Sequence, residues 1–466
     1  MKRPELLAPA GNFEKMKSAI LYGADAVYLA GEIFGMRAAA DNFSVDELSE
    51  AVKYAHDRGV KVYLTLNTMP REYEYKLLKD YLADLAGIGL DAMIIADIGV
   101  LMLVKELLPN MEIHISTQAN SVSVASCLAW AALGAKRIVL ARELTLDEIR
   151  AIRSALPEEI EIECFILARE LTLEEIKSIK AQIPADLELE CFIHGSMCIS
   201  YSGRCLLSGQ IVGREANRGM GAQPCRWNYS IRGYEISEEK RPDAAFPVEE
   251  INGETFIMAS RDTCTIEHIP ELIEAGIDSF KIEGRMKSAY YTAVVTNTYK
   301  MAIDSYFSGS YEYNPLWYRE LESVSHRDYA TGYYYSDSHT DANLSKTSGY
   351  IKDKAYLAVA VGYDKETGLA EFTQRNKMVV GDSIELLTPG KTGVSLTVTK
   401  LYDENMNEIN SFNNYVPQIL AYADREYYGC GDYIIMSIDR EGKIAMWPKD
   451  KELDGFIDKL VNNPGF

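Results

Sequence analysis

Residues 5–30 read ELLAPAGNFEKMKSAILYGADAVYLA, and this stretch decides the fold. The largely apolar run at 5–9 predicts a β-strand. Asn12 is placed to cap the helix that follows, and Gly23 is placed to end it. A second apolar run, at 26–30, predicts a strand parallel to the first. A strand, a helix and a parallel strand form the repeating unit of α/β proteins.

The same alternation continues along the chain. Helices are expected at 44–58, 72–88, 100–108, 122–133, 146–156 and 289–307, and strands at 61–67, 91–97, 112–118, 137–142 and 278–284. Because more than six such units follow one another, the pattern favours a closed, TIM-like (β/α)8 barrel over an open sheet. We therefore predict an α/β fold with a barrel domain at 1–310.

An internal repeat lies inside this pattern. Residues 140–165, LARELTLDEIRAIRSALPEEIEIECF, recur at 167–192 as LARELTLEEIKSIKAQIPADLELECF, with an offset of 27 residues. Each copy supplies a helix and a strand, so the chain offers about nine strands where eight close a barrel. We therefore expect the helix and strand of one copy to lie outside the barrel.

The rest of the chain divides into segments of different character. A Cys-rich insertion is expected at 194–275, and a Tyr-rich connecting segment at 311–348. Short apolar runs separated by turn residues at 349–440 predict a small all-β domain that forms a barrel. Residues 441–466 are expected to form a tail.

Composition limits the classes of function. The net charge of −21 argues against nonspecific binding of nucleic acid or membrane by the whole molecule, but it allows a local basic site. No apolar run approaches the roughly 18 residues of a membrane span. The first residues, MKRPELLAPAGNF, lack the apolar core of a signal peptide. We expect a cytoplasmic protein whose eight cysteines serve a metal or catalysis before disulfides.

The stretch at 192–227 departs from the acidic composition of the chain. It reads FIHGSMCISYSGRCLLSGQIVGREANRGMGAQPCRW and carries three cysteines and four arginines: Cys198, Cys205, Cys225, Arg204, Arg214, Arg218 and Arg226. Thiols beside guanidinium groups ionise more readily, which favours metal binding. With Cys264, four soft ligands would suit an iron–sulfur cluster as well as zinc. The spacing is not that of paired CxxC motifs, so buried cysteines without a metal are an equal alternative.

A second set of polar residues follows the predicted barrel strands. The candidate catalytic residues are Arg37, Asn67, Gln118, Arg142, His194, Glu283 and Arg285. On barrel folds such positions form the active site, although each residue alone could equally be a helix cap or a loop hydrogen bond. The guanidinium groups of Arg37, Arg142 and Arg285 would suit a carboxylate or a phosphate. The chain has no HExxH, G-x-S-x-G or P-loop motif to support a peptidase or an NTPase.

Several stretches resemble one known family. Residues 188–209, ELECFIHGSMCISYSGRCLLSG, resemble the signature of the U32 peptidase family. PELLAPAG at 4–11, DSFKIEGRMKS at 278–288 and SHRDYATGYY at 325–334 also resemble that family. The resemblance covers about 3–335, and the final β-domain is similar to the C-terminal barrel of the family. It is greatest to the branch that hydroxylates tRNA, whereas the older label of the family is collagenase-like peptidase.

The resemblance implies a reaction and a cofactor. It implies conversion of the wobble uridine of tRNA to 5-hydroxyuridine, with prephenate as co-substrate in an oxygen-independent route and an iron–sulfur cluster, 4Fe-4S, as cofactor. Cys198, Cys205 and Cys225 match cluster cysteines, and Cys264 matches a cysteine of many members. Gly221 stands where many members have a further cysteine, so the fourth ligand is expected to be Cys264.

The resemblance also implies tRNA as a partner. The four arginines of the Cys-rich stretch, with Arg232, could hold RNA phosphates. Tyr201 and Trp227 could stack on an unpaired base, or could simply pack within the protein. A partner subunit of the same family is a further expectation. Three functions remain open: a tRNA uridine hydroxylase, a U32-type peptidase, and a metal-stabilised RNA-binding scaffold without catalysis.

Overall fold

A computed structural model of the chain forms two compact units. The first comprises Met1–Met16, Ala24–Lys287 and Arg327–Tyr350, and the second comprises Lys17–Gly23, Ser288–His326 and Ile351–Phe466. The residues that the structure describes are 2–35, 41–121, 123–139, 161–165, 174, 177, 189–196, 228–229, 236–238, 241–246, 250–251, 254–256, 261–332, 334–335, 350–351, 354–364, 369–402, 407–412, 419–423, 434–438 and 443–446.

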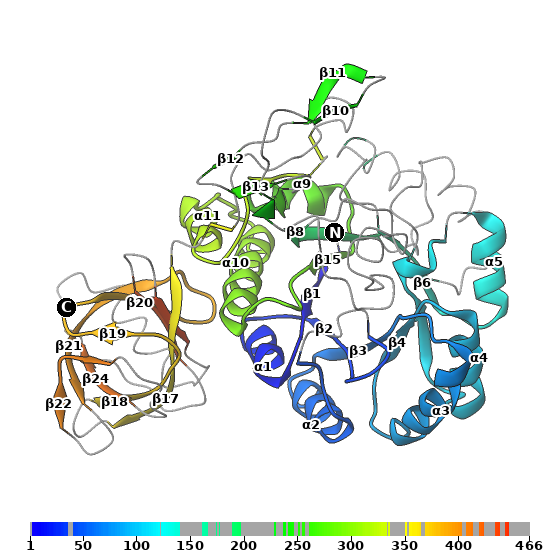
Figure 1. Cartoon of the computed structure of the whole chain (residues 1–466), viewed down its shortest axis with the longest axis horizontal. Helices are drawn as coiled ribbons and strands as arrows, with labels where there is room; N and C mark the ends of the chain where they lie inside the picture. Colours follow the sequence, from blue (N-terminus) through cyan, green and yellow to red (C-terminus); the bar gives the residue numbers. More distant parts are fainter. Residues whose placement is uncertain are drawn as a thin grey trace. The chain divides into compact units, whose positions relative to one another are not determined.

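The first unit is built on a parallel sheet that closes on itself (Figure 1). Its strands are β1 (Glu5–Pro9), β2 (Ala26–Leu29), β3 (Lys61–Leu66), β4 (Ala92–Ile95), β5 (Glu112–Ile115), β6 (Arg137–Val139), β7 (Glu161–Phe165), β8 (Leu189–Ser196) and β15 (Ser279–Ile282). Each strand pairs in parallel with the next, and β15 pairs with both β8 and β1. The described part of the chain therefore contains a closed ring of nine parallel strands, called the strand ring below.

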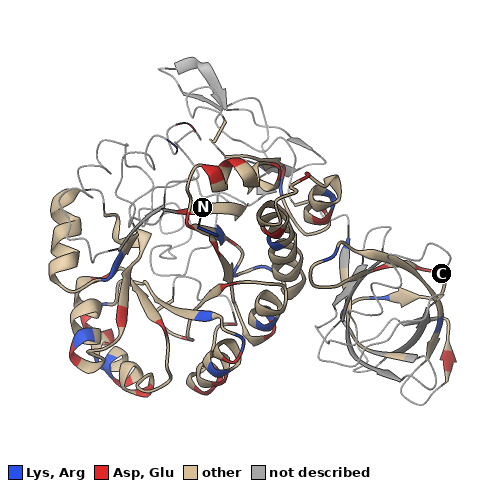
Figure 2. Ribbon diagram, turned by 180° about the vertical axis from the view of Figure 1, so that it is seen from behind, with Lys and Arg blue, Asp and Glu red and all other residues tan. Residues whose placement is uncertain are grey.

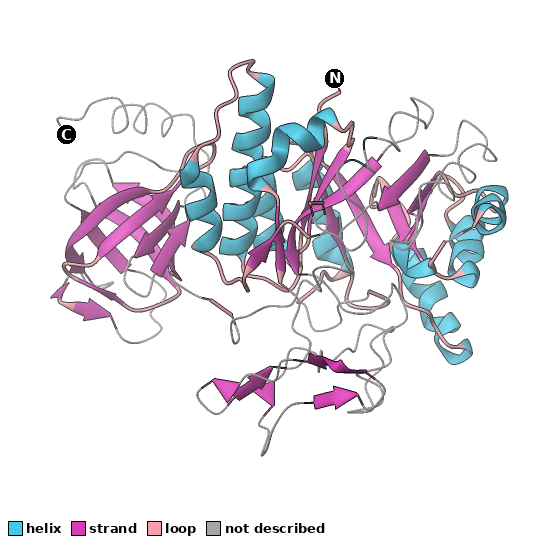
Figure 3. Cartoon of the chain, turned by 90° about the horizontal axis from the view of Figure 1, so that it is seen from above, coloured by secondary structure: helices cyan, strands magenta, loops and turns pink. Residues whose placement is uncertain are grey.

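Helices follow the first five strands. They are α1 (Phe13–Leu21), α2 (Val45–His56), α3 (Tyr75–Asp84), α4 (Ile98–Leu107) and α5 (Val124–Ala132), with short helices η1 (Glu72–Glu74) and η2 (Thr117–Ala119). Helices α2 to α5 lie outside the strand ring (Figure 1), and Figure 3 shows helices and strands in separate colours from above. In α2 the side chains of Ser44 and Glu47 form the expected capping box. Figure 2 shows basic and acidic residues interspersed on α2 and α3. None of the described helices is long and apolar enough to cross a membrane.

The predicted parallel sheet is confirmed, but the expected accommodation of the repeat was wrong. The first copy contributes β7 and the second contributes β8, and these two strands are neighbours in the strand ring. The ring therefore has nine strands where a (β/α)8 barrel has eight. A strand placed outside the ring would leave its backbone N–H and C=O groups without partners in a sheet. A strand inserted into the ring pairs with a neighbouring strand along each of its two edges.

Further strands extend from the carboxyl end of β8. Strand β14 (Asp262–Cys264) pairs antiparallel with β8, and β16 (Tyr329–Ala330) pairs in parallel with β14. The described parts of the predicted insertion form two small antiparallel sheets, from β10 (Ile236–Glu238) with β11 (Arg241–Phe246), and from β9 (Asn228–Tyr229), β12 (Glu250–Ile251) and β13 (Glu254–Phe256). The short helices η5 (Ile266–His268) and α9 (Ile269–Glu274) precede β15.

The second unit combines helices α10 (Ala289–Phe307) and α11 (Pro315–Glu322) with an all-β part, which confirms the expected β-domain. Six antiparallel strands close a ring in this part: β17 (Ala355–Asp364), β18 (Leu369–Gln374), β20 (Ser383–Leu387), β21 (Val394–Tyr402), β24 (Ile419–Ala423) and β25 (Ile434–Ile438). Strands β22 (Glu408–Ile409) and β26 (Lys443–Met446) add to it, and β19 (Met378–Val379) pairs with β23 (Ser411–Phe412). The residues expected to be a tail thus include a strand.

The compact units do not divide at residue 310. Helix α10 belongs to the second unit, and its Asn297 amide holds the turn between β20 and β21. Asn297 Nδ2 donates to the carbonyl oxygen of Lys391 at 2.8 Å, and Asn297 Oδ1 accepts from the Gly390 N–H at 2.7 Å. One side chain thus ties the helix to this turn.

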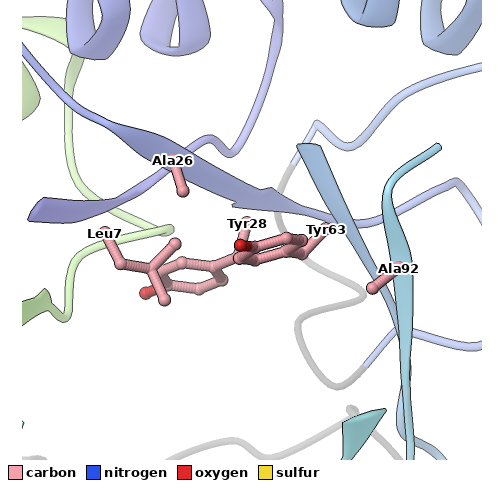
Figure 4. Packing of buried hydrophobic residues seen from close by; sticks show 5 residues of the cluster. All are labelled: Leu7, Ala26, Tyr28, Tyr63 and Ala92. Atoms are coloured by element: carbon pink, nitrogen blue, oxygen red, sulfur yellow. The ribbon is translucent and has the colours of Figure 1, made fainter. Parts of the chain in front are cut away.

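A group of buried residues marks the interior of the strand ring. Leu7, Ala26, Tyr28, Tyr63 and Ala92 come from four neighbouring strands and point to the same side of the sheet (Figure 4). Two of the five are tyrosines, whose hydroxyl groups need hydrogen-bond partners when buried. The interior of the ring is therefore polar as well as apolar.

Candidate functional site

A cavity of about 110 Å³ lies inside the strand ring. Its lining residues come from β1 to β6, from β8 and β15, and from the turns that follow the strands: Leu7, Tyr28, Tyr63, Thr65, Asn67, Ile94, His114, Ser116, Thr117, Gln118, Arg137, Val139, Phe192, Lys281, Glu283 and Arg285. Four predicted catalytic residues, Asn67, Gln118, Glu283 and Arg285, are therefore brought together at one cavity. They follow β3, β5 and β15, where parallel strands carry active sites.

Arg285 is held inside this cavity with little exposure to solvent. Its guanidinium Nη1 donates to Thr65 Oγ1 at 2.8 Å, and the Thr65 hydroxyl donates to the carbonyl oxygen of Leu29 at 3.0 Å. Arg285 is 3% exposed. Two neighbouring strands, β2 and β3, thus fix the direction of a cation that sequence reasoning placed at the site.

Lys281 is a cavity residue that sequence reasoning missed. Its Nζ lies 2.7 Å from Glu190 Oε1, and the Ser279 hydroxyl donates to Glu190 Oε2 at 3.1 Å. Glu190 is completely buried. The signal that could have found this pair is alternation, because Ser279 and Lys281 are two residues apart and therefore share one face of a strand.

Arg137 and His114 form a second group that the sequence did not assign to the site. Arg137 Cζ lies 6.0 Å from the centroid of the Tyr63 ring, and the His114 ring centroid lies 5.2 Å from that of Tyr63. His114 Nε2 is 2.8 Å from Glu112 Oε1. The hydrogen bond with His114 lowers the pKa of Glu112, although partial burial opposes this shift. The cavity thus holds an imidazole and a guanidinium beside one aromatic ring.

The remaining polar groups of the cavity are joined by hydrogen bonds. Ser116 Oγ accepts from the Gln118 N–H at 3.2 Å and from Asn67 Nδ2 at 3.5 Å. The Tyr28 hydroxyl lies 3.0 Å from the carbonyl oxygen of Ile282 and 3.3 Å from Glu283 Oε2, and it can donate to either. These contacts orient amide and carboxylate groups toward the same space.

His194 does not line the cavity. It lies in β8, where a bulge opposite β15 shifts the register, and its Nε2 is 3.5 Å from the Tyr329 hydroxyl. The next residue, Gly195, has a φ of +112°, and a Cβ atom there would lie 2.3 Å from the carbonyl oxygen of Glu283. Glycine therefore allows β8 to pass close to the end of β15. The bulge redirects the His194 side chain away from the cavity residues.

Of the predicted cluster cysteines, the structure describes Cys264. It is buried in β14, and its register partner in β8 is His194. Strand β8 ends at Ser196, two residues before Cys198, which is the first predicted ligand. Cys264, a buried soft donor, therefore lies on the strand that pairs with β8. A metal centre shared by these cysteines stays a prediction. No group of three or more His, Cys, Asp or Glu able to hold a metal ion occurs within the described ranges.

Other predicted site residues lie outside the described residues. They are Arg37, Arg142, Cys198, Tyr201, Arg204, Cys205, Arg214, Arg218, Cys225, Arg226, Trp227 and Arg232. Their predicted roles in binding a cluster, a carboxylate or RNA stay predictions.

Comparison with known proteins identifies the family. Residues 11–167 and 165–344 match peptidase family U32, and residues 352–424 match the peptidase family U32 C-terminal domain. The first two matched segments meet at 165–167, between the two copies of the repeat. This junction is where a duplicated unit would interrupt a match to the family.

Three relatives carry different names. The "tRNA hydroxylation protein P1" of Bacillus subtilis is 34% identical, over 92% of this chain and 93% of that protein. The "23S rRNA 5-hydroxycytidine C2501 synthase" of Escherichia coli is 35% identical, over 65% of this chain and 40% of that protein. The "Collagenase" of Porphyromonas gingivalis is 32% identical, over 84% of this chain and 87% of that protein. With the matched segments spanning most of its length, the chain belongs to peptidase family U32.

Proposed function

We propose that this protein hydroxylates tRNA, converting the wobble uridine to 5-hydroxyuridine with prephenate as co-substrate. The observation that carries the proposal is the similarity, along nearly the whole chain, to a protein named for tRNA hydroxylation. A second relative is named as a synthase of 5-hydroxycytidine in rRNA. That nucleoside and the proposed 5-hydroxyuridine are both pyrimidine nucleosides hydroxylated at carbon 5.

The cavity in the strand ring supports this proposal through its chemistry. Arg137, Lys281 and Arg285 supply cationic donors, and Asn67 and Gln118 supply amides, at one small space. Such groups suit a carboxylate co-substrate that enters from the carboxyl ends of the strands.

The proposal includes an iron–sulfur cluster of the 4Fe-4S type held by Cys198, Cys205, Cys225 and Cys264. Thiolates are the usual ligands of such clusters, and a bound cluster would supply one-electron redox chemistry. The pairing of Cys264 in β14 with His194 in β8, the strand that leads toward Cys198, supports its inclusion as fourth ligand, since Gly221 offers none.

A deletion strain tests the function directly. Its tRNA should lack 5-hydroxyuridine in nucleoside mass spectrometry, and the wild-type gene should restore it. Cys198→Ala should not restore it, while Cys127→Ala, which removes a buried thiol of α5, should. Full restoration of 5-hydroxyuridine by Cys198→Ala would refute the role of a cluster held by Cys198. Unchanged 5-hydroxyuridine in the deletion strain would refute the function itself.

Peptidase activity is the second candidate, because one relative is named collagenase. A serine peptidase needs a hydroxyl activated by a base. The Ser116 hydroxyl in the cavity instead accepts hydrogen bonds from Gln118 and Asn67. Cleavage of gelatin by protein purified from a strain that lacks other proteases would favour the peptidase. A colourless, zinc-containing protein that binds tRNA without modifying it would favour the scaffold.

A further inference from the structure

The turn after β15 gives three consecutive residues different surroundings. The Lys287 N–H donates to the carbonyl oxygen of Gly284 at 2.7 Å, which closes the turn. Within it, Arg285 is buried and lines the cavity, whereas Met286 is 44% exposed. Ser288 then caps α10 with its side chain. The backbone on both sides of Lys287 is therefore held in place, at the carboxyl end of β15 and beside the cavity.

An exposed aromatic ring lies against Lys287. Lys287 Nζ is 4.5 Å from the centroid of the Tyr350 ring, and Tyr350 is 38% exposed. The residue after Tyr350 is anchored, because Ile351 and His326 exchange two backbone hydrogen bonds, at 2.7 and 3.2 Å. An ammonium group over an aromatic face is attracted to it and occupies that face. The opposite face of the Tyr350 ring is therefore the one on which a further planar group can stack.

The carboxylate of Asp262, whose charge interacts with that of Lys287, is already compensated by another cation. Arg327 Nε and Nη2 donate to Asp262 Oδ1 at 3.0 and 2.7 Å, and the Arg327 N–H donates to Oδ2 at 3.2 Å. Asp262 is thus part of a buried ion pair of its own. In a chain with a net charge of −21, two cations, Arg285 and Lys287, follow β15 within three residues.

This combination of side chains is typical of sites for single-stranded nucleic acid. Unpaired bases stack on aromatic side chains, and lysine or arginine contacts the phosphates of the backbone. The segment beside the cavity has an exposed ring in Tyr350, a cation in Lys287 and an exposed thioether in Met286. Methionine is flexible and polarisable, and its sulfur makes favourable contacts with aromatic groups.

We propose that Tyr350, Lys287 and Met286 bind an unpaired nucleotide of RNA beside the cavity of the strand ring. The base stacks on the face of Tyr350 opposite Lys287, Lys287 contacts the neighbouring phosphate, and Met286 contacts the edge of the base. This inference rests on the proposed function, because a base that is modified inside a protein first has to leave its stack. The three residues are separate from the cations inside the strand ring and from the arginines of the Cys-rich stretch.

Binding of an end-labelled oligouridine to the purified full-length protein, followed by fluorescence anisotropy, tests the inference. We expect Tyr350→Ala to weaken binding by about fivefold to a hundredfold, the loss expected when one stacked base loses its aromatic partner. Tyr350→Trp should equal or exceed the wild-type affinity, because the indole ring offers a larger face. Phe307→Ala is the matched control, since Phe307 is a similarly exposed aromatic residue, at the end of α10, and its loss should leave the affinity unchanged.

Salt dependence separates the charge of Lys287 from the ring of Tyr350. Loss of one phosphate contact with a single strand should reduce the slope of log affinity against log salt concentration by about 0.7. Lys287→Gln should therefore bind more weakly and show the shallower slope, while Lys287→Arg should keep the wild-type slope. Tyr350→Ala should lose affinity without a change of slope. Lys53→Gln, at an exposed position in the last turn of α2, should leave affinity and slope unchanged.

Wild-type affinity in Tyr350→Ala, or the wild-type slope in Lys287→Gln, would overturn the assignment. Tighter binding by the wild type of an RNA duplex with the same number of phosphates than of oligouridine would also overturn it, because bases in a duplex are already stacked on one another. This last comparison needs no variant, so the assignment can fail even if a substitution disturbs folding.

The two proposals fail in different ways. Binding of oligouridine that depends on Tyr350 and Lys287, in a protein whose deletion leaves 5-hydroxyuridine unchanged, would refute the tRNA reaction and keep the nucleotide site. Loss of 5-hydroxyuridine in the deletion strain, with oligouridine binding unaffected by Tyr350→Ala and Lys287→Gln, would refute the nucleotide site and keep the reaction.

Discussion

A Cβ atom on Gly11 would lie 2.2 Å from the carbonyl oxygen of Arg285. The turn after β1 therefore passes directly against the backbone that presents the Arg285 guanidinium to the cavity. We predict that Gly11→Ala displaces Arg285 from Thr65, weakens prephenate binding, and lowers stability by about 1–3 kcal/mol, as overpacking does. Titration calorimetry and the thermal midpoint measure the two effects.

Gly59→Ala provides the comparison for this glycine. Gly59 has a φ of +71° and no neighbouring atom within 4 Å of an added Cβ, so alanine there strains the backbone without touching the cavity. This variant should lose stability and keep its affinity for prephenate. Equal affinity in Gly11→Ala would show that the position of Arg285 does not matter.

Cys264 and Cys127 are both buried, but they differ in their predicted role. We predict that Cys264→Ala, purified without oxygen, loses most of its bound iron and its visible absorbance. Cys127→Ala should retain both, because burial raises the pKa of the Cys127 thiol to about 11 and keeps it from acting as a thiolate ligand. Iron content per protein is the measurement. A full iron complement in Cys264→Ala would exclude it as the fourth ligand.

The pair of Asp262 and Arg327 joins β14 to the segment that carries β16. Arg327 Nη2 and Nε donate to Asp262 Oδ1 at 2.7 and 3.0 Å, and both residues are buried. Removing one partner of a buried pair costs roughly 3–5 kcal/mol. Arg327→Met should therefore lower the urea midpoint strongly at neutral pH. Asp262→Asn with Arg327→Met should recover part of the loss, and no recovery would mean that the pair does not act as a unit.

The same pair predicts a response to acid. Burial alone would raise the pKa of Asp262, but the charges of Arg327 and Lys287, with the hydrogen bonds of Arg327, outweigh burial and lower it. Its contribution to stability is therefore present above the ordinary carboxyl pKa of about 3.9 and is lost as the pH falls through the lowered value. Urea midpoints of the wild type should fall more steeply below about pH 4 than those of the variant that lacks both partners. Parallel curves would contradict this.

The sequence predicted what depends on local pattern. Strand β1 lies where the run at 5–9 placed it, and Ser44 caps α2 with Glu47 as the spacing indicated. Lys281 and Glu190 could not be paired in this way, because they are 91 residues apart in the chain and meet only when β15 closes the strand ring against β8. The strand number is likewise a property of closure, since a local pattern cannot tell whether a ninth strand enters a ring or stays outside.

Glu320 predicts a dependence on pH in the second unit. Burial raises its pKa to about 7, with repulsion from Glu385 adding to the shift, although the Gly393 N–H opposes it. Between the ordinary carboxyl pKa of about 4.3 and pH 7, the folded state holds a proton that the unfolded state releases. Stability of the second unit should therefore fall as the pH rises through this window. Thermal midpoints between pH 5 and pH 8 measure it.

Glu320→Gln should remove that dependence, because the amide has the same shape and no charge. Its thermal midpoint at pH 8 should exceed that of the wild type, while Glu322→Gln, at an exposed position of the same helix, should change nothing. A midpoint of the wild type that rises between pH 5 and pH 8 relative to Glu320→Gln would give the opposite sign and reject the prediction.

The repeat predicts that this fold can lose one whole unit. Deletion of 141–167 joins Leu140 to Ala168 and leaves one intact copy, because the repeat offset is 27 residues. With β7 gone, β8 can pair directly with β6, since both run parallel in the same ring. We expect the variant to fold with eight strands and with a cooperative thermal transition, because closure again leaves no unpaired edge. Circular dichroism and thermal melting measure this.

Removal of half a unit should have the opposite effect. Deletion of 141–154 alone keeps β7 but leaves only a few residues between β6 and β7, whereas a parallel crossover needs roughly a dozen or more. That variant should not fold. The shortened connection keeps β7 from pairing in parallel with β6, and displacement of β7 from the sheet would open the strand ring. If the variant that lacks the whole unit also fails to fold, this ring requires its ninth strand and cannot close with eight.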